Sequence, residues 1–300
     1  MGRVISSKEK QQENNPGLYV ISTPIGNLLD FSQRAKNVLK DCDLVLAEDT
    51  RIAMKLLNTY GINKKRRQIV SCHKFNEMRR LKNLNFEELR KQMVGLMADA
   101  GTPSISDPGS KIVEKYHQLG LPVRSVPGCC SVTAGFSISG IELKSNQTLT
   151  FGGFFPKKKK DVDDLLEKLS TSTDYVVFFE SANRMENLVQ QLEKFFQEDL
   201  DIFLAKEMTK IHESTWKGLC SELLTELQQG SGEKKEKFFR GEFVVIVDLS
   251  KLKQPTGSDK ELEFWLKTLK PHVKATTLVK ILSKKFGKDR QEMYSTLLIK

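Results

Sequence analysis

The sequence has no long apolar run. No stretch approaches the roughly 20 apolar residues that are needed to span a bilayer. Residues 1–15 are polar and lack the apolar centre of a secretory signal. We therefore expect no contact with a membrane and a cytoplasmic location.

Cysteine and histidine are few, and their spacing is unsuited to a disulfide framework or a metal site. The five cysteines are odd in number, include the adjacent pair Cys129 and Cys130, and form no C-x-x-C motif. The four histidines do not have the spacing of metal ligands. We expect reduced thiols and no bound metal.

Several common catalytic motifs are also missing. The chain contains no G-x-G-x-x-G, no G-x-x-x-x-G-K-[ST] and no G-x-S-x-G. Dinucleotide binding, P-loop nucleotide binding and serine hydrolase chemistry therefore lose their main sequence support.

What the chain does contain is a regular alternation of short apolar runs and amphipathic segments. Its 300 residues, 39% of them hydrophobic, are enough for two globular domains. Alternation of this kind indicates an α/β fold. We expect strands at 18–21, 43–47, 68–72, 94–99, 123–126, 149–154, 175–179, 201–205 and 243–248. We expect helices at 31–39, 52–60, 78–93, 109–119, 184–196 and 221–228.

Changes in composition suggest where the domains begin and end. A glycine-containing polar segment at 139–147 separates the fifth strand from the sixth. We predict a disordered polar extension at 1–16, an N-terminal α/β domain at 17–143 and a second α/β domain at 144–249. Residues 250–300 form a basic helical extension, because their apolar residues recur at helical spacing.

Positive charge is concentrated near the C-terminus. The chain has a net charge of +10, and residues 251–300 hold 12 Lys and Arg against 5 Asp and Glu. Further basic clusters lie at 64–67, 79–80, 157–160 and 234–240. Clustered lysine and arginine favour a polyanionic partner such as nucleic acid. A solvated surface remains equally open from charge alone.

Small, turn-forming residues follow the strands. The apolar run ending at Ala98 leads into Asp99–Gly109, and the run ending at Ile21 leads into Ser22–Leu28. Because the carboxyl ends of parallel strands meet at one edge of a sheet, these loops are expected to share a crevice. Polar residues in the second domain, at 180–184, 206–209 and 240–242, should face the same crevice.

The glycines in these loops have two possible explanations. Gly26, Gly101 and Gly128 could each serve only a tight turn. Their joint placement beside Asp99 and Thr102 instead favours a neutral slot lined by backbone. Such a slot suits a nucleoside-like ligand better than a phosphate, and adenosine with an amino-acid zwitterion fits that description.

Seven motifs in and around these loops occur in a characteristic order. They are Ser22–Leu28, Ala47–Arg51, Asp99–Gly109, Pro127–Gly128, Phe178–Ser181, Ala205–Glu213 and Arg240–Phe243. Together they closely resemble the motifs of the ribosomal RNA small subunit methyltransferase I family, which belongs to the tetrapyrrole methylase superfold. The resemblance covers about residues 17–249. The chain departs from the family pattern at Ser104, at Cys129–Cys130 and at Ala182–Asn183.

This resemblance implies a function and a cofactor. It implies S-adenosylmethionine-dependent 2'-O-methylation of a cytidine in the decoding region of 16S rRNA, by a homodimer that acts on the small ribosomal subunit. The cofactor would lie in the cleft between the two α/β domains. The residues implied to bind it are Pro24, Asp99, Ala100, Gly101, Thr102, Pro103, Pro127, Gly128, Ser181, Lys206 and Gly241.

Methyl transfer to a ribose also needs a proton acceptor and groups that hold the RNA. A sulfonium methyl is already activated, so the protein chiefly aligns the acceptor oxygen and helps to remove its proton. The candidate proton acceptors are Glu48, Asp49 and Glu180, although each could be a helix cap or an internal ion-pair partner. The candidate substrate-binding residues are Asn27, Arg51, His73, Lys74 and Arg184.

Two other functions remain open from the sequence. A tetrapyrrole carbon methyltransferase would share the fold and the cofactor and would also bind an anionic substrate. A non-catalytic RNA-binding assembly factor would explain the basic clusters without any methyl transfer, and it would not bind S-adenosylmethionine.

Overall fold

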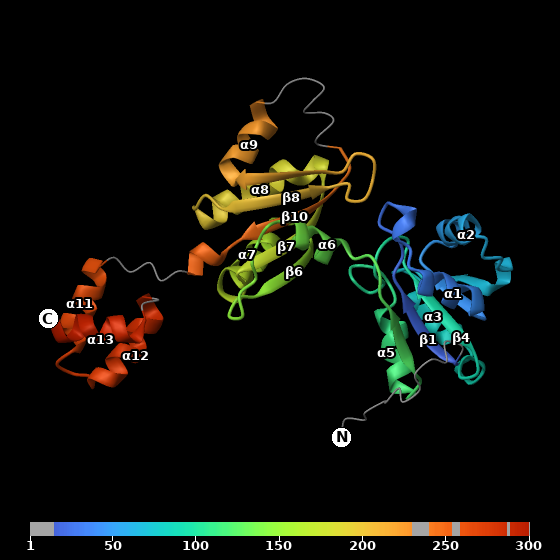
Figure 1. Cartoon of the computed structure of the whole chain (residues 1–300), viewed down its shortest axis with the longest axis horizontal. Coiled ribbons are helices and arrows are strands. Elements are labelled where there is room, and N and C mark those ends of the chain that lie inside the picture. Colours follow the sequence, from blue (N-terminus) through green and yellow to red (C-terminus); the bar gives the residue numbers. More distant parts are fainter. Residues whose placement is uncertain (1–14, 230–239, 254–258, 287–288, 300) are drawn as a thin grey trace.

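The computed structural model describes residues 15–229, 240–253, 259–286 and 289–299. Most of the extension predicted at 1–16 therefore lies outside the described residues. Figure 1 shows two separate sheets, each with helices beside it, and a small group of helices towards the C-terminus. The predicted α/β architecture with a helical extension is confirmed. Within the described ranges, no helix is long and apolar enough to cross a membrane.

The first sheet is parallel throughout and has the strand order β3-β2-β4-β1-β5. Its central strand β4 is buried along its whole length, as expected for a strand covered on both faces. The strands are β1 (Gly17–Ile21), β2 (Leu44–Ala47), β3 (Ile69–Ser71), β4 (Met93–Met97) and β5 (Val123–Val126). The helices are η1 (Leu28–Asp30), α1 (Gln33–Asp41), α2 (Thr50–Thr59), η2 (Arg66–Gln68), α3 (Glu77–Asn83), α4 (Phe86–Leu89) and α5 (Ser110–Gln118).

The prediction of one continuous helix at 78–93 is wrong. The chain forms two short helices in this range, α3 and α4, and Met93 already belongs to β4. Asn85 begins α4, because its side chain accepts a hydrogen bond from the backbone N–H of Glu87 and the chain before it is extended. The helical spacing of apolar residues therefore continues across the break between α3 and α4, and periodicity alone does not reveal that break.

The second sheet is mixed and has the order β6-β7-β10-β8-β9. Strands β6 and β7 are parallel, whereas β10 runs antiparallel to both β7 and β8, and β9 runs antiparallel to β8. The strands are β6 (Leu149–Phe154), β7 (Tyr175–Ser181), β8 (Asp201–Lys206), β9 (Ser214–Leu219) and β10 (Glu242–Asp248). The helices are α7 (Lys159–Ser172), α8 (Ala182–Phe196) and α9 (Cys220–Gln229).

Strand β9 and helices α6 and α7 were not among the expected elements. Helix α6 (Ser131–Ile138) packs against β10 of the second sheet, where a Cβ added to Gly135 would lie 2.8 Å from Val244 Cγ1. The boundary at 143/144 stays a prediction. The structure adds that α6, which comes before that boundary, covers the second sheet.

The C-terminal helices have a core of their own. They are α11 (Asp259–Leu269), α12 (Ala275–Phe286) and α13 (Arg290–Ile299). The short helix η3 (Ser250–Lys253), which comes before them, belongs with the second sheet, because its Leu252 packs against the core of that sheet. Leu262 and Leu266 of α11 pack with Leu278 and Leu282 of α12, on the faces that the helical spacing predicted. In Figure 1 this group stands apart from both sheets.

Candidate functional site

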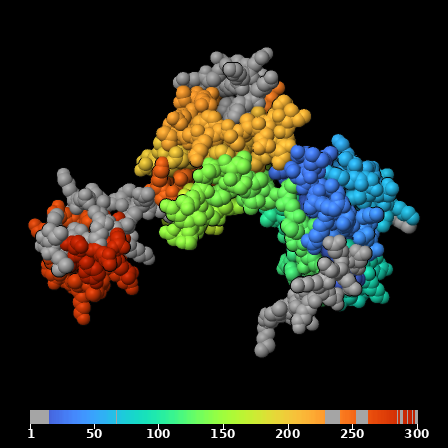
Figure 2. All heavy atoms as spheres, viewed as in Figure 1, coloured from blue at the N-terminus to red at the C-terminus, as the bar shows by residue number. Residues whose placement is uncertain are grey.

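A cavity of about 450 Å³ lies where the strand ends of the two sheets meet. Figure 2 shows the bodies that carry the two sheets in contact over a narrow zone, with a hollow beside it. Residues from both bodies line the cavity. They are Ile25, Glu48, Asp99, Ala100, Gly101, Thr102, Ile105, Ser106, Asp107, Cys130, Ser131, Phe154, Phe179, Glu180, Ser181, Ala205, Glu207, Met208, Lys210, Glu242, Phe243 and Val244.

The topology explains why these residues converge. All strands of the first sheet end at the same edge, because they are parallel. In the second sheet β10 is antiparallel to β7 and β8, so its first residues lie beside their last. Phe243 of β10 pairs with both Glu180 of β7 and Lys206 of β8. This is why the 240–242 segment reaches the cavity although it precedes its strand.

The loops after β1, β4 and β5 are tied to one another. Thr23 and Gly101 exchange backbone hydrogen bonds of 2.9 and 3.1 Å. The Thr102 hydroxyl donates to the Cys129 carbonyl at 2.9 Å and lies 2.9 Å from the Ser22 hydroxyl. Gly101 has a φ of +82°, a conformation that favours glycine. The loops therefore form one connected wall of the cavity.

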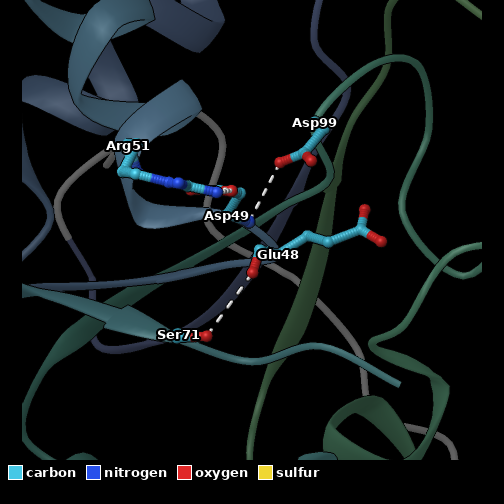
Figure 3. Close-up of polar contacts among 5 residues, drawn as sticks. All are labelled: Glu48, Asp49, Arg51, Ser71 and Asp99. Atoms are coloured by element: carbon cyan, nitrogen blue, oxygen red, sulfur yellow. Dashed lines mark hydrogen bonds and ion pairs between the residues drawn. The ribbon is translucent and has the colours of Figure 1, made fainter. Parts of the chain in front are cut away.

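Three carboxylates gather on this wall. Burial, followed by the charge of Asp99, raises the pKa of Glu48. Burial, followed by the charges of Glu48 and Asp99, raises the pKa of Asp107 to about 6. Burial also raises the pKa of Asp99, which accepts a hydrogen bond of 3.0 Å from the backbone N–H of Asp49. Figure 3 shows the Glu48 side chain extending away from Arg51.

Positive charges act on this carboxylate cluster without pairing with it. Burial raises the pKa of Glu48 and of Asp99, and the charges of His73 and Arg51, respectively, offset only part of that rise. Within the described ranges, no lysine or arginine forms an ion pair with Glu48, Asp99 or Asp107. Carboxylates that raise one another's pKa are stabilised by a positive charge placed between them. The wall is thus suited to a cationic ligand. No group of residues fit to hold a metal ion occurs among the described residues.

Asp49 points elsewhere. Its carboxylate accepts hydrogen bonds from the Arg51 side chain, at 2.6 Å from Nη2, and from the Arg51 backbone N–H at 2.8 Å. These bonds lower the pKa of Asp49 to about 2. The pair begins helix α2 (Figure 3). A carboxylate held in this way is a weak proton acceptor.

Glu180 is buried, and its carboxylate contacts Ser181 and Arg184. Its Oε1 accepts a hydrogen bond of 2.8 Å from the Ser181 backbone N–H, and its Oε2 lies 3.3 Å from Arg184 Nη2. Arg184 also donates to the carbonyls of Phe155 and Pro156, at 2.6 and 3.1 Å. Both side chains therefore stabilise the second wall.

A close approach links the two bodies beside the cavity. The Asn27 backbone N–H donates to Thr209 Oγ1 at 2.9 Å. A Cβ on Gly26 would lie 2.6 Å from both that oxygen and Lys210 Cγ. Lys210 itself bridges Glu207 and Glu242, at 3.0 and 3.1 Å. Gly26 is therefore required for the contact between the bodies.

The structure brings part of the predicted set to the cavity. The predicted residues in the lining are Glu48, Asp99, Ala100, Gly101, Thr102, Glu180 and Ser181. The predicted residues outside the lining are Pro24, Asn27, Asp49, Arg51, His73, Lys74, Pro103, Pro127, Gly128, Arg184, Lys206 and Gly241. Their roles stay predictions.

Some of these outer residues support the walls. Gly128 packs on Ser22, whose Cβ would lie 3.0 Å from an added Cβ. Gly241 has a φ of +102°, and a side chain there would meet Glu207. Lys206 is buried, and burial lowers its pKa. Lys206 is therefore buried behind the residues that line the cavity.

Sequence reasoning missed the apolar half of the lining. Phe179 lies in an apolar strand and resembles an ordinary core residue, whereas Ile25 and Met208 lie inside the strand-end motifs, where only the polar residues and the small residues were considered. Asp107, Glu207 and Lys210 lay inside the motifs already noted, and a count of ionisable residues in those motifs could have found them. The apolar residues can contact a flat heterocycle of a ligand, and the carboxylates can bind a positively charged group of the same ligand.

A family model matches this chain. The model described as "Tetrapyrrole (Corrin/Porphyrin) Methylases" matches residues 17–224. Three similar curated proteins are each named "Ribosomal RNA small subunit methyltransferase I". The protein of Mesomycoplasma conjunctivae is 35% identical over 78% of this chain and 92% of its own length. That of Xylella fastidiosa is 32% identical over 94% and 99%, and that of Thermotoga maritima is 35% identical over 77% and 97%.

Solved structures share the fold. A diphthine synthase has a TM-score of 0.56 and 14% identity, covering 77% of this chain and 89% of its own. A cobalt precorrin-4 methyltransferase has a TM-score of 0.53 and 14% identity, covering 82% and 99%. At these identities the likeness shows the fold alone.

Proposed function

Because the chain belongs to the ribosomal RNA small subunit methyltransferase I family of tetrapyrrole methylases, we propose that it transfers a methyl group to a cytidine ribose in 16S rRNA. The family's methyl donor is S-adenosylmethionine, and the acceptor is the 2'-oxygen of a nucleotide in the decoding region. The observation that carries the proposal is the cavity at the strand ends of both sheets, with its cluster of carboxylates and its apolar wall.

The residues of the cavity fit the cofactor. S-adenosylmethionine supplies an activated methyl group on a positively charged sulfur. Asp99, Glu48 and Asp107 provide the negative charge that favours a sulfonium and an ammonium. Ile25 and Met208 offer apolar contact for an adenine ring. Gly101 lines the cavity without a side chain, so the backbone there can approach a ligand closely.

Glu48 is the best supported proton acceptor. It lines the cavity, and burial raises its pKa, which makes its carboxylate a stronger base than an exposed glutamate. Asp49 and Glu180 were candidates too, but their carboxylates are held by Arg51 and by Arg184. Glu48 would take the proton from the ribose hydroxyl as the oxygen attacks the methyl carbon in line.

The RNA is expected to reach the cavity from outside, across basic side chains. Arg51 and Lys74 are exposed on the rim of the first sheet, and they would contact phosphates. His73 precedes Lys74 in the loop after β3, and Asn27 lies in the loop after β1. A small-subunit substrate also fits the surplus of positive charge in residues 251–300. The cytoplasm, where this substrate is found, is the proposed site of action.

We also infer that the chain acts as a homodimer. Exposed apolar side chains, among them Leu29, Phe75, Met78 and Ile211, lie on or next to the strand-end loops and would be covered in such a dimer. Sedimentation equilibrium tests this inference directly. A mass twice that of the chain supports it, and a monomer at micromolar concentration contradicts it.

The proposed function is tested with S-adenosylmethionine labelled in its methyl group. Small ribosomal subunits from cells that lack this activity should become labelled, whereas an anionic tetrapyrrole precursor should not. Label on the tetrapyrrole alone would favour a carbon methyltransferase. Failure to bind S-adenosylmethionine in calorimetry would favour a non-catalytic assembly factor.

A further inference from the structure

Phe154 is an aromatic side chain at the mouth of the cavity. It is the last residue of β6, it lines the cavity, and 64% of its surface is exposed. Its ring meets that of Phe179 edge to face, with the centroids 5.5 Å apart and the planes at 71°. Phe179 therefore supports one edge of the Phe154 ring, while much of that ring remains exposed.

A bulge in β6 turns Phe154 to this side. Side chains alternate along a strand, so Phe151 and Phe154 would normally face opposite ways. Both rings nevertheless contact Phe179, with centroids 4.9 and 5.5 Å away. The pairing register with β7 shifts between Phe151 and Gly153, and this extra residue changes the alternation.

Glycine makes the bulge possible. A Cβ on Gly152 would lie 2.3 Å from Phe178 Cε1, and Gly153 has a φ of +70°. The backbone after the bulge is then fixed, because Phe155 is buried against Phe178 and its carbonyl accepts a hydrogen bond from Arg184. The segment thus holds Phe154 outward, where its apolar ring remains exposed.

Four lysines follow this ring. Lys157, Lys158, Lys159 and Lys160 are all exposed, and the last two begin helix α7. In the part of the chain that the structure describes, none of them forms an ion pair. An exposed aromatic ring followed closely in the chain by unpaired cations is typical of proteins that bind single-stranded nucleic acid through base stacking and phosphate contact.

We propose that Phe154 is the platform on which a base of the substrate RNA stacks at the cavity, while Lys157–Lys160 bind the phosphates of the same strand. Enzymes that act on one nucleotide within a folded RNA must bring that nucleotide out of its stack, and an aromatic face stabilises it there. This proposal rests on the proposed function, and it names the subsite that receives the nucleotide.

RNA fits this ring better than the cofactor does. A cofactor enclosed between the two walls would bury the rings that it touches, and Phe179 already lies deeper in the cavity than Phe154. Phe154 is the more exposed of the two rings, and the four lysines follow it in the chain after Phe155 and Pro156. Stacking on the cofactor's adenine is the alternative that the experiment must separate.

The test uses the full chain with Phe154→Leu and, as the conservative variant, Phe154→Tyr. The probes are S-adenosylmethionine, followed by calorimetry, and a short fluorescein-labelled single-stranded oligoribonucleotide, followed by polarisation. Loss of one stacked base predicts oligonucleotide binding weaker by about 5- to 150-fold in Phe154→Leu. Phe154→Tyr should bind like the unaltered chain, and affinity for S-adenosylmethionine should not change in either variant.

The lysines are tested by the dependence of oligonucleotide binding on salt. Changing Lys157 and Lys158 together to glutamine should lower the slope of log K against log salt by about 1.4, since each phosphate contact on a single strand contributes about 0.7. The matched control replaces Lys168, which is exposed later in α7 and does not line the cavity. An unchanged slope in the double variant would refute the proposal that these lysines bind phosphates.

The outcomes distinguish this proposal from the proposed function. Weaker oligonucleotide binding by Phe154→Leu, together with no methyl transfer to small subunits by the unaltered chain, would support the subsite and refute the proposed function. Methyl transfer by the unaltered chain with oligonucleotide binding unchanged in Phe154→Leu would refute the subsite alone. Weaker binding of S-adenosylmethionine with RNA binding unchanged would assign Phe154 to the cofactor and overturn the proposal.

Discussion

Replacing Asp107 by asparagine should stabilise the body that carries the first sheet, and only above acidic pH. Burial and the charges of Glu48 and Asp99 raise the pKa of Asp107 from 3.8 to about 6. In the folded chain this carboxyl therefore holds its proton at a pH where the unfolded chain has lost it. Its contribution to stability is lost as the pH rises from about 4 through 6.

The size of the effect follows from that shift in pKa. About two pKa units correspond to roughly 3 kcal/mol, because one unit is 1.36 kcal/mol. Asp107 is partly exposed, so solvent screens the interaction, and we expect about 1 kcal/mol. Asp107 accepts no hydrogen bond from the described residues, so asparagine forfeits none.

Amide hydrogen exchange in β1 and β4 measures this free energy, because it reports the opening of this sheet alone. At pH 8 the exchange of these amides in D107N should be slower than in the unaltered chain by a factor of about 5. At pH 4 the two should exchange alike. The control D164N alters an exposed aspartate of α7 and should show no difference at either pH. Equal exchange of D107N and the unaltered chain at pH 8 would refute the electrostatic reasoning.

Three further predictions concern the site and the tail. Glu48→Gln should lower kcat by about 10²- to 10⁴-fold if Glu48 takes the ribose proton, and an unchanged kcat in single-turnover assays would exclude that role. Gly26→Ala should weaken S-adenosylmethionine binding in calorimetry, because its Cβ would come within 2.6 Å of Thr209 Oγ1 and push the two bodies apart; full affinity would mean that this contact does not shape the cavity. Deleting residues 251–300 should weaken small-subunit binding and reduce the salt dependence of that binding, while S-adenosylmethionine binding is kept. If the truncated and the full-length chain bind small subunits equally well across a salt series, the tail has no role in RNA binding.

The sequence predicts most of the architecture because the strongest patterns are local. Strands β5 and β6 begin and end at the predicted residues, because each is a short segment with a large apolar residue at both ends, Val123 and Val126 in one and Leu149 and Phe154 in the other. Strand β9 was missed because Ser214–Leu219 carries polar and half-exposed residues at the edge of a sheet. Its pairing with β8 depends on tertiary contacts that no local pattern encodes.

The candidate site could be predicted only in part, for a similar reason. Loops rich in glycine and proline identify one wall, and Asp99 and Thr102 do line the cavity. Asp49 and Arg51 occur in the same motif, yet they pair with each other at the start of α2. The exposure of Phe154 depends on a bulge, and two adjacent glycines were the sole local sign of it.

The central claim is that this chain methylates a cytidine at its ribose 2'-oxygen. The most direct measurement is mass mapping of nucleosides from small subunits incubated with the chain and methyl-labelled S-adenosylmethionine. The account predicts one labelled nucleoside, a cytidine with the added methyl group on its ribose, from the decoding region. Label on a base, on a nucleoside other than cytidine, or on none of the RNA would contradict it.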